Sequence, residues 1–176
     1  MASEYEYALI HHQIPGWDKR PPSNEEWFVT DQSAKRGLLK LLQRVRRELQ
    51  IVWGDCDRDF FNQYDVIEAL RSILAGCAAV EIIFSKDVPD LQAAQAEFER
   101  FNPRLWGLIG SNRERFKLYW CQRRLQQRYA IADGRDLYLE NPKYKPGLTI
   151  IKHDEELASR WARRFQAFAE KHGNQL

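Results

Sequence analysis

The residues whose types and spacing could do chemistry lie together in the stretch 125–141, LQQRYAIADGRDLYLEN. Arg128 precedes Asp133 by five positions, in a segment that carries further basic residues. A guanidinium group is permanently charged and presents its donors as a planar fork, so Arg128 could hold a phosphate or another anion. The alternative is an ordinary strand arginine, solvated or paired with an acidic neighbour. Anion binding is therefore the first chemistry that this stretch suggests, and a simple ion pair is the competing interpretation.

The backbone pattern around these residues predicts a β-hairpin. Residues 127–132 alternate and are rich in strand formers, and the pattern resumes over 137–139. Between them, Asp133-Gly134 is the strongest short turn signal available. Because side chains alternate along a strand, Arg128 and Tyr129 are expected to face opposite sides of the sheet.

The same stretch resembles the signature of the phospholipase D superfamily, His-x-Lys-x4-Asp followed after six residues by Gly-Ser-x-Asn. Aligning the two aspartates gives the motif-equivalent positions Gln126, Arg128, Asp133, Glu140 and Asn141. The spacing fits, but a glutamine stands at the histidine position, an arginine at the lysine position, and Glu140-Asn141 at the Gly-Ser position. The resemblance extends over about residues 27–171 and comprises a single, degenerate copy of the motif.

The residue at position 126 decides what the resemblance implies for catalysis. In that family the histidine attacks phosphorus and forms a covalent intermediate, which requires a ring nitrogen with a lone pair and a pKa near neutral. The carboxamide of Gln126 is no such nucleophile, so we expect no catalytic residue and no cofactor. The expected function is that of a non-catalytic module that binds a protein partner or a phosphate-bearing ligand such as nucleic acid. The candidate anion-binding residues are Arg123, Arg124, Arg128 and Arg135.

The family also implies two motif copies that meet at one site, within one chain or across a dimer. One copy in this sequence therefore predicts a homodimer or a partner subunit. A third interpretation is a structural subunit of a larger assembly, because aromatic residues are enriched at interfaces. The tryptophans outside the predicted helix faces are Trp17, Trp27, Trp106 and Trp120. Core positions are the more common place for such residues.

The acidic loop 55–59 suggests an enzyme of a different kind. Asp55 and Asp57 follow an apolar strand, as in the haloacid dehalogenase-like phosphotransferases, in which one aspartate is the nucleophile, the next a general acid, and carboxylates hold magnesium. Against this alternative, a full helix precedes the strand, and Asp136 begins a strand where that family places a helix. A solvated loop or helix cap is the more common role, so Asp55 and Asp57 are weak metal candidates and no other metal site is expected.

Composition and charge exclude several classes of function. A net charge of +2 gives no sequence-independent attraction to nucleic acid or anionic lipid, so any such binding must come from local clusters. Three widely spaced cysteines suggest neither a zinc site nor a disulfide framework and favour a cytoplasmic location. No segment approaches the roughly 20 apolar residues of a membrane span, and no signal-peptide pattern is found.

The order of the predicted elements indicates an α/β fold. We expect one domain, 1–176, with residues 1–26 as an N-terminal strand and loop extension. Predicted strands, besides the hairpin, cover 5–10, 27–30, 50–53, 79–84, 116–121 and 148–151. Predicted helices cover 32–48, 60–76, 89–100 and a segment that begins after Asp154. We further expect a loop over 105–115, and Gly76 in the left-handed position that ends a helix. This order predicts a mixed β-sheet flanked by helices on both faces, as in the phospholipase D-like fold.

Overall fold

The computed structural model describes residues 23–29, 33–54, 58–122, 125, 128–141 and 148–176. The strands of this described part form one eight-stranded sheet in the order β1-β7-β6-β5-β2-β3-β4-β8. Their bounds are β1 Glu25–Val29, β2 Glu48–Trp53, β3 Ala79–Ser85, β4 Phe116–Cys121, β5 Tyr129–Ala132, β6 Asp136–Asn141, β7 Leu148–His153 and β8 Asn174–Gln175. The sheet is mixed, because β2, β3 and β4 run parallel while every other neighbouring pair is antiparallel.

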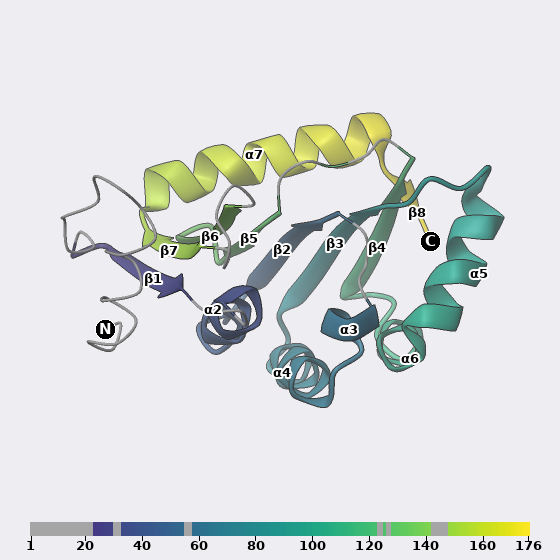
Figure 1. The fold of residues 1–176 in the computed structure, drawn as a ribbon, viewed down its shortest axis with the longest axis horizontal. Helices are drawn as coiled ribbons and strands as arrows, with labels where there is room; N and C mark the ends of the chain where they lie inside the picture. Colours follow the sequence, from purple (N-terminus) through teal and green to yellow (C-terminus); the bar gives the residue numbers. More distant parts are fainter. Residues whose placement is uncertain (1–22, 30–32, 55–57, 123–124, 126–127, 142–147) are drawn as a thin grey trace.

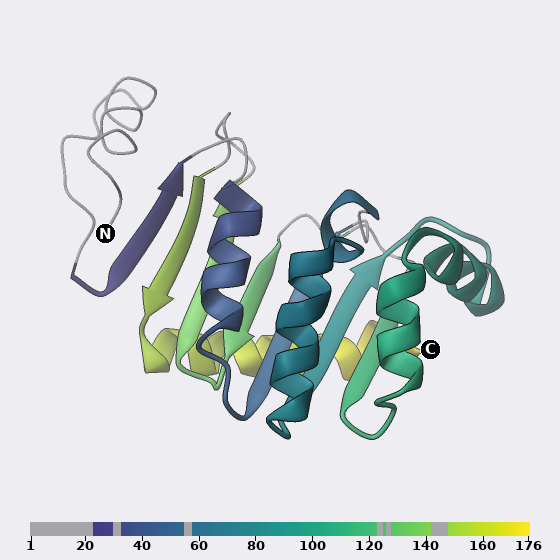
Figure 2. The same cartoon turned by 90° about the horizontal axis from the view of Figure 1, so that it is seen from below.

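Helices cover both faces of this sheet. They are α2 (Ser33–Leu42), α3 (Arg58–Phe61), α4 (Tyr64–Ala75), α5 (Leu91–Phe101), α6 (Pro103–Gly110) and α7 (Glu155–His172). Figure 1 shows α7 alone across one face, with α2, α4, α3 and α6 on the other, and α5 beyond β4. Figure 2 shows α2, α4 and α6 side by side in front of the strands, with α7 behind them. The predicted α/β architecture, with helices on both faces of a mixed sheet, is confirmed.

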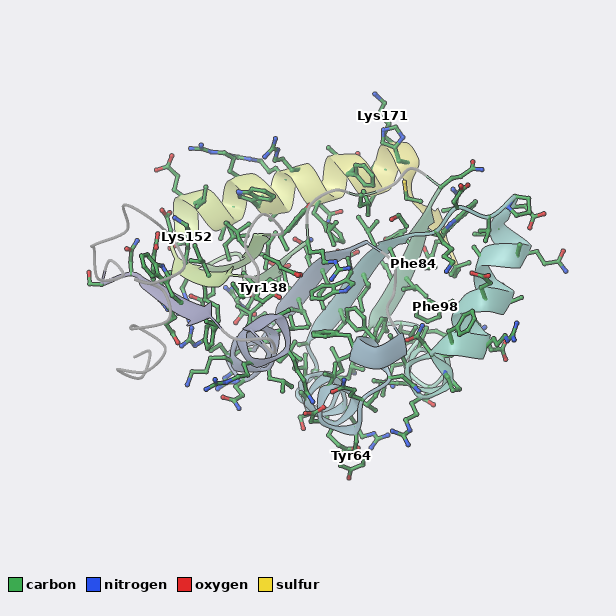
Figure 3. The ribbon with its side chains drawn as sticks, viewed as in Figure 1. Tyr64, Phe84, Phe98, Tyr138, Lys152 and Lys171 are labelled. Atoms are coloured by element: carbon green, nitrogen blue, oxygen red, sulfur yellow. The ribbon has the colours of Figure 1, made fainter. Side chains whose placement is uncertain are left out.

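Each face of the sheet has its own apolar core. The larger core lies between the strands and the α2, α4 and α6 side, and the smaller one lies beneath α7. Tyr138 and Phe84 belong to the larger core and lie between the sheet and its helices (Figure 3). Gly37 lets α2 approach the sheet closely, because a Cβ atom at this position would lie 2.5 Å from Thr149 Cγ2. The strands between these two cores are therefore shielded from water on both faces.

The predicted hairpin is confirmed. β5 and β6 pair antiparallel, with Tyr129 opposite Leu139. The turn contains two consecutive residues with positive φ, Asp133 at 54° and Gly134 at 63°. Glycine and aspartate are among the few residues that adopt this left-handed conformation readily, which is why the Asp-Gly pair specifies the turn.

The helix predicted over 32–48 is wrong in its second half. α2 ends at Leu42, and β2 begins at Glu48, two residues before the predicted strand. Val45 and Leu49 continue the helical spacing of apolar residues, but Val45 is buried in the connection and Leu49 is fully buried in the strand. Apolar residues of a buried loop and of a buried strand thus happened to continue the helical spacing, which made the predicted helix too long.

Three further expectations are corrected. The predicted helix 60–76 is two helices, α3 and α4, and Gly76 has a φ of −74° whereas the next residue, Cys77, takes the left-handed conformation at 68°. The predicted loop over 105–115 contains most of α6, which begins at Pro103, where the missing N–H of proline costs nothing.

The remaining elements agree with prediction to within a few residues, and one strand was missed. α5 begins at Leu91 behind Asp90, whose carboxylate accepts the Ala93 N–H at 2.8 Å. α7 begins behind Asp154, as predicted, and the two-residue β8 was not predicted. Trp27 and Trp120 are buried, and Trp106 packs against the larger core. The strand predicted at 5–10 and Trp17 lie outside the described residues.

Candidate anion-binding site

Arg128 lies at the end of the sheet where β2 stops. It directly precedes β5, whose partner β2 ends at Trp53, and its guanidinium carbon is 5.2 Å from the centre of a Trp53 ring. This distance is within the range of a cation–π contact, in which the ring face attracts the positive charge. The Arg128 side chain keeps 37% of its surface exposed. Arg128 is therefore supported from below by an aromatic ring and open to solvent in part.

Trp53 is fixed by three aromatic side chains from two elements, α3 and β6. Its ring stacks on Phe60 at 4.5 Å and on Tyr138 at 6.1 Å, and it meets Phe61 edge-on at 5.2 Å. The Tyr138 hydroxyl donates a hydrogen bond to the Ala34 carbonyl at 3.1 Å, and burial raises the pKa of this tyrosine. The platform under Arg128 is therefore rigid, because β6, α2 and α3 all hold it.

Glu140 is the acidic partner of Arg128 across the hairpin. Its N–H donates to the Arg128 carbonyl at 3.2 Å, and its Oε2 lies 3.6 Å from Arg128 Nη1. The Glu140 side chain is only 17% exposed. Burial raises the pKa of Glu140, and the nearby Arg128 charge offsets only part of that rise. Oε2 is buried, and no residue of the described chain gives it a hydrogen bond.

Gly54 and Ser85 complete this end of the sheet. The Ser85 N–H donates to the Gly54 carbonyl at 2.9 Å, and the Ser85 hydroxyl accepts the Leu125 N–H at 3.3 Å. A Cβ atom at position 54 would lie 3.8 Å from Arg128 Nε, in ordinary contact. Arg128 is thus packed beside the carboxyl ends of the parallel strands β2 and β3. This is the edge at which α/β sheets commonly bind ligands.

Asp133, the motif aspartate, serves the opposite end of the hairpin. Its carboxylate accepts the backbone N–H groups of Arg46, Arg47 and Glu48 at 2.8 to 3.2 Å. These donors belong to the chain that leads into β2. Asp133 therefore fixes the start of a central strand and does not share a site with Arg128.

Of the candidate arginines, the structure describes Arg128 and Arg135, and these two lie at opposite ends of the hairpin. Arg135 lies at the turn end of the hairpin, is 63% exposed, and pairs with Asp136 at 3.4 Å. Asn141 ends β6, and nothing is described of its side chain. The predicted site residues outside the described part of the chain are Arg123, Arg124, Gln126, Asp55 and Asp57. Trp53, the platform for Arg128, was not predicted, and its one sequence signal was an aromatic residue at the end of an apolar strand.

A second group of charged side chains lies at the far end of the sheet. His153 Nδ1 is 2.7 Å from Asp136 and its Nε2 is 2.9 Å from Glu26, which also pairs with Arg44. Burial alone would raise the pKa of Glu26, but the hydrogen bonds from Arg44 and His153 outweigh it and the pKa is lowered. Because both ring nitrogens of His153 have partners, the group has no free base and joins β1, β6 and β7.

The comparisons with known proteins find similarity at the level of structure. No family model matches the sequence, and no curated protein matches it. Among solved structures, the archaeal chromatin protein TrmBL2 superposes with a TM-score of 0.66 at 9% identity, over 98% of this chain and 62% of that chain. The chain therefore spans less than two thirds of the TrmBL2 chain.

Two phospholipase D-type proteins are also similar. The phospholipase D family member Nuc from Salmonella typhimurium has a TM-score of 0.60 at 12% identity, over 86% of this chain and 97% of that chain. NucT from Helicobacter pylori has a TM-score of 0.56 at 14% identity, over 85% and 98%. The chain thus has the phospholipase D-like fold, as the motif spacing predicted.

Metal ions and membranes are two other classes of partner to consider for the described part of the chain. No group of three or more His, Cys, Asp or Glu side chains in that part of the chain is arranged to hold a metal ion. None of the described helices combines the length and the hydropathy needed to cross a membrane.

Proposed function

We propose that this protein is a phospholipase D-like module that binds the phosphate backbone of nucleic acid at the strand end occupied by Arg128, and that it does not hydrolyse the phosphodiester. The observation that carries the proposal is the position of Arg128, partly exposed, on the Trp53 ring and beside the ends of β2 and β3. A guanidinium held on a rigid ring loses little freedom when it binds an anion, which favours affinity.

The absence of hydrolysis rests on the sequence. Gln126 stands where the superfamily has its nucleophilic histidine, and an amide does not attack phosphorus. Arg128 replaces a lysine and remains charged at every physiological pH. Arg128 can therefore still hold a phosphate, whereas Gln126 cannot act as the nucleophile that cleaves it.

The choice of nucleic acid as the ligand draws support from one structural neighbour. TrmBL2 is described as a chromatin protein with a novel mode of DNA binding, and the two folds superpose over nearly all of this chain. At 9% identity this likeness concerns the fold. It makes DNA the first ligand to test. A net charge of +2 gives little long-range attraction, so we expect the affinity to come from direct contacts between individual side chains and phosphates.

Replacing Arg128 by alanine tests the proposal. We expect the affinity for DNA to fall about tenfold and the salt dependence of binding to lose about one unit of slope, as for the loss of one phosphate contact. Fluorescence anisotropy at several salt concentrations measures both. Arg135→Ala is the matched control, because it removes an equal charge from the other end of the same hairpin. Equal losses in the two variants would contradict a specific role for Arg128.

Replacing Glu140 by glutamine is expected to strengthen DNA binding about fivefold, since it removes the charge that competes with phosphate for Arg128. The raised pKa of Glu140 also predicts a pH dependence. As the pH falls through that pKa, protonation neutralises the carboxylate, so wild-type affinity should rise whereas that of the variant should stay level. An oligonucleotide without terminal phosphates keeps its own charge constant in this titration.

The same substitution has a defined effect on stability. A carboxyl group whose pKa is raised on folding costs stability while it is ionised, and the cost disappears as the pH falls toward its unfolded value. Glu140→Gln should therefore raise the unfolding free energy at neutral pH and remove this pH dependence. The double variant Arg128→Ala/Glu140→Gln separates the roles: tight DNA binding by it would show that Arg128 is not the phosphate contact.

Two other expectations stay predictions. A second motif copy meeting the first, in a homodimer or with a partner subunit, is implied by the resemblance alone. The dehalogenase-like alternative depends on Asp55 and Asp57, which lie outside the described residues, and the phospholipase D-like sheet order gives it no support.

A further inference from the structure

A groove lies on the opposite face of the sheet from Arg128, between α7 and the strands β2 and β5. Its volume is about 450 Å³, which falls within the range of sites for small organic ligands. The lining residues are Val52, Leu125, Tyr129, Trp161, Arg164, Ala167, Phe168, Lys171 and His172.

The floor of the groove is aromatic. Tyr129 and Trp161 meet edge-to-face with ring centres 4.7 Å apart, and Phe168 contacts the His172 ring at 5.1 Å. Burial raises the pKa of Tyr129 to about 12 although Arg164 opposes the rise, so its hydroxyl stays protonated and can donate a hydrogen bond at neutral pH. Such a floor suits a flat ring that also carries polar atoms.

The rim of the groove is basic. Arg164 lies over the Trp161 ring at 5.1 Å, and Lys171 projects from the C-terminal end of α7 (Figure 3). No acidic residue is among the described side chains that line the groove. From Arg160 to the end of α7 the only acidic residue is Glu170. A rim with this positive charge favours a ligand that carries a negative charge.

The groove and the Arg128 site lie back to back at one end of the sheet. Val52 and Tyr129 line the groove, while their chain neighbours Trp53 and Arg128 face the other side. Leu125 connects the two, since it lines the groove while its carbonyl lies 3.6 Å from a Cβ atom built on Gly54. The two sites therefore share the end of β2 and the start of β5.

We propose that the groove binds a nucleotide, with the base against the aromatic floor and the phosphate at Arg164 and Lys171. The source is either a free nucleotide or an unpaired nucleotide of a single strand, since both present the same ring and phosphate. In the second case this inference rests on the proposed function and deepens it: bases in a duplex are stacked and paired, so the module prefers single strands.

Calorimetry tests the ligand class. The wild-type protein is titrated separately with a nucleoside monophosphate, with the matching nucleoside and with inorganic phosphate. The nucleoside monophosphate should bind at least about tenfold more tightly than either fragment, because only it uses both floor and rim. Tighter binding of an apolar carboxylate such as dodecanoate, with no binding of the nucleotide, would overturn the inference.

Arg164→Gln should weaken binding of the nucleoside monophosphate about tenfold, the effect of one charge-assisted contact. Arg163→Gln is the matched control, as an exposed residue on the same helix that does not line the groove, and should change affinity less than about twofold. Trp161→Leu keeps an apolar side chain beneath α7 and should weaken binding of the free nucleoside as well. Equal affinities in wild type and Arg164→Gln would contradict the inference.

The two proposals fail separately. Arg128→Ala should leave binding of the free nucleotide unchanged, because Arg128 faces the other side of the sheet. If Arg128→Ala weakens DNA binding while Arg164→Gln weakens the binding of neither DNA nor the free nucleotide, the groove inference fails and the proposed function stands. If Arg164→Gln alone weakens binding, the groove holds the ligand and the Arg128 proposal fails.

Discussion

Replacing Asp133 by alanine is expected to lower the free energy of unfolding by about 3 kcal/mol. The carboxylate accepts the backbone N–H groups of three successive residues, Arg46 to Glu48, which lead into the central strand β2. Alanine leaves these donors without that partner and must also adopt a φ of 54°, which aspartate tolerates better. For a chain of this size the loss corresponds to a melting temperature lower by roughly 10 °C.

Urea and thermal unfolding measure this change, and Asp133→Asn is the matched control. Asparagine tolerates the left-handed conformation and keeps one acceptor oxygen, so it should cost about half as much. DNA binding measured well below the transition should be unchanged in both variants, because Asp133 is at the far end of the hairpin from Arg128. A wild-type melting temperature in Asp133→Ala would contradict this structural role.

Replacing Trp53 by alanine is expected to cost about 4 kcal/mol, because it empties the space between β2, α3 and the sheet. Trp53 is 1% exposed and contacts three other aromatic rings. The same substitution removes the ring beneath Arg128, whose guanidinium would then sample many orientations. Stability and DNA affinity should therefore fall together.

Trp53→Phe separates these two effects. Phenylalanine keeps an aromatic face and removes an indole N–H that is buried without a hydrogen-bond partner among the described residues, so its cost in stability should be about 1–2 kcal/mol. It stays folded at room temperature, where affinity is measured by anisotropy. A loss of DNA affinity of about threefold is expected, since a cation–π contact weakens from tryptophan to phenylalanine. Unchanged affinity would argue against the platform role of the ring.

The parts of the fold that could be predicted are those set by local signals. An Asp-Gly pair between alternating segments specifies the hairpin, and both residues have the positive φ that this pair favours. Asp154 marks the start of α7, as predicted, because its carboxylate accepts the Leu157 N–H. Asp90 does the same for α5, although the prediction began that helix at Pro89. The apolar run at 79–84 predicted a strand covered on both faces, and β3 is central in the sheet.

The errors arose where tertiary burial imitated a local period. Val45 and Leu49 fit the spacing of the α2 helix, yet they are buried by a loop and by β2. Cys77 has the left-handed conformation, although the preceding Gly76 would adopt it at lower cost. The surrounding tertiary structure therefore sets which of the two residues takes it. Period alone does not distinguish these cases.

The candidate site was predictable in part. The alternation of side chains along a strand predicted Arg128 on the face away from Tyr129. Ala130, two residues after Arg128, lies in the larger core, and Tyr129 lies in the smaller one. The pairing of Arg128 with Glu140 follows from the hairpin register once the turn is known. The Trp53 platform and the groove beneath α7 depend on contacts between residues far apart in the sequence, so no local pattern announces them.

Under the proposed function, the module binds nucleic acid through Arg128 without cleaving it. The most direct measurement incubates the wild-type protein with an end-labelled oligonucleotide and follows bound fraction and strand length in the same sample. We expect the wild-type protein to bind the DNA and to leave it at full length throughout, and Arg128→Ala to bind it about tenfold more weakly. Shortened strands that no longer form when Gln126 or Arg128 is replaced would contradict it.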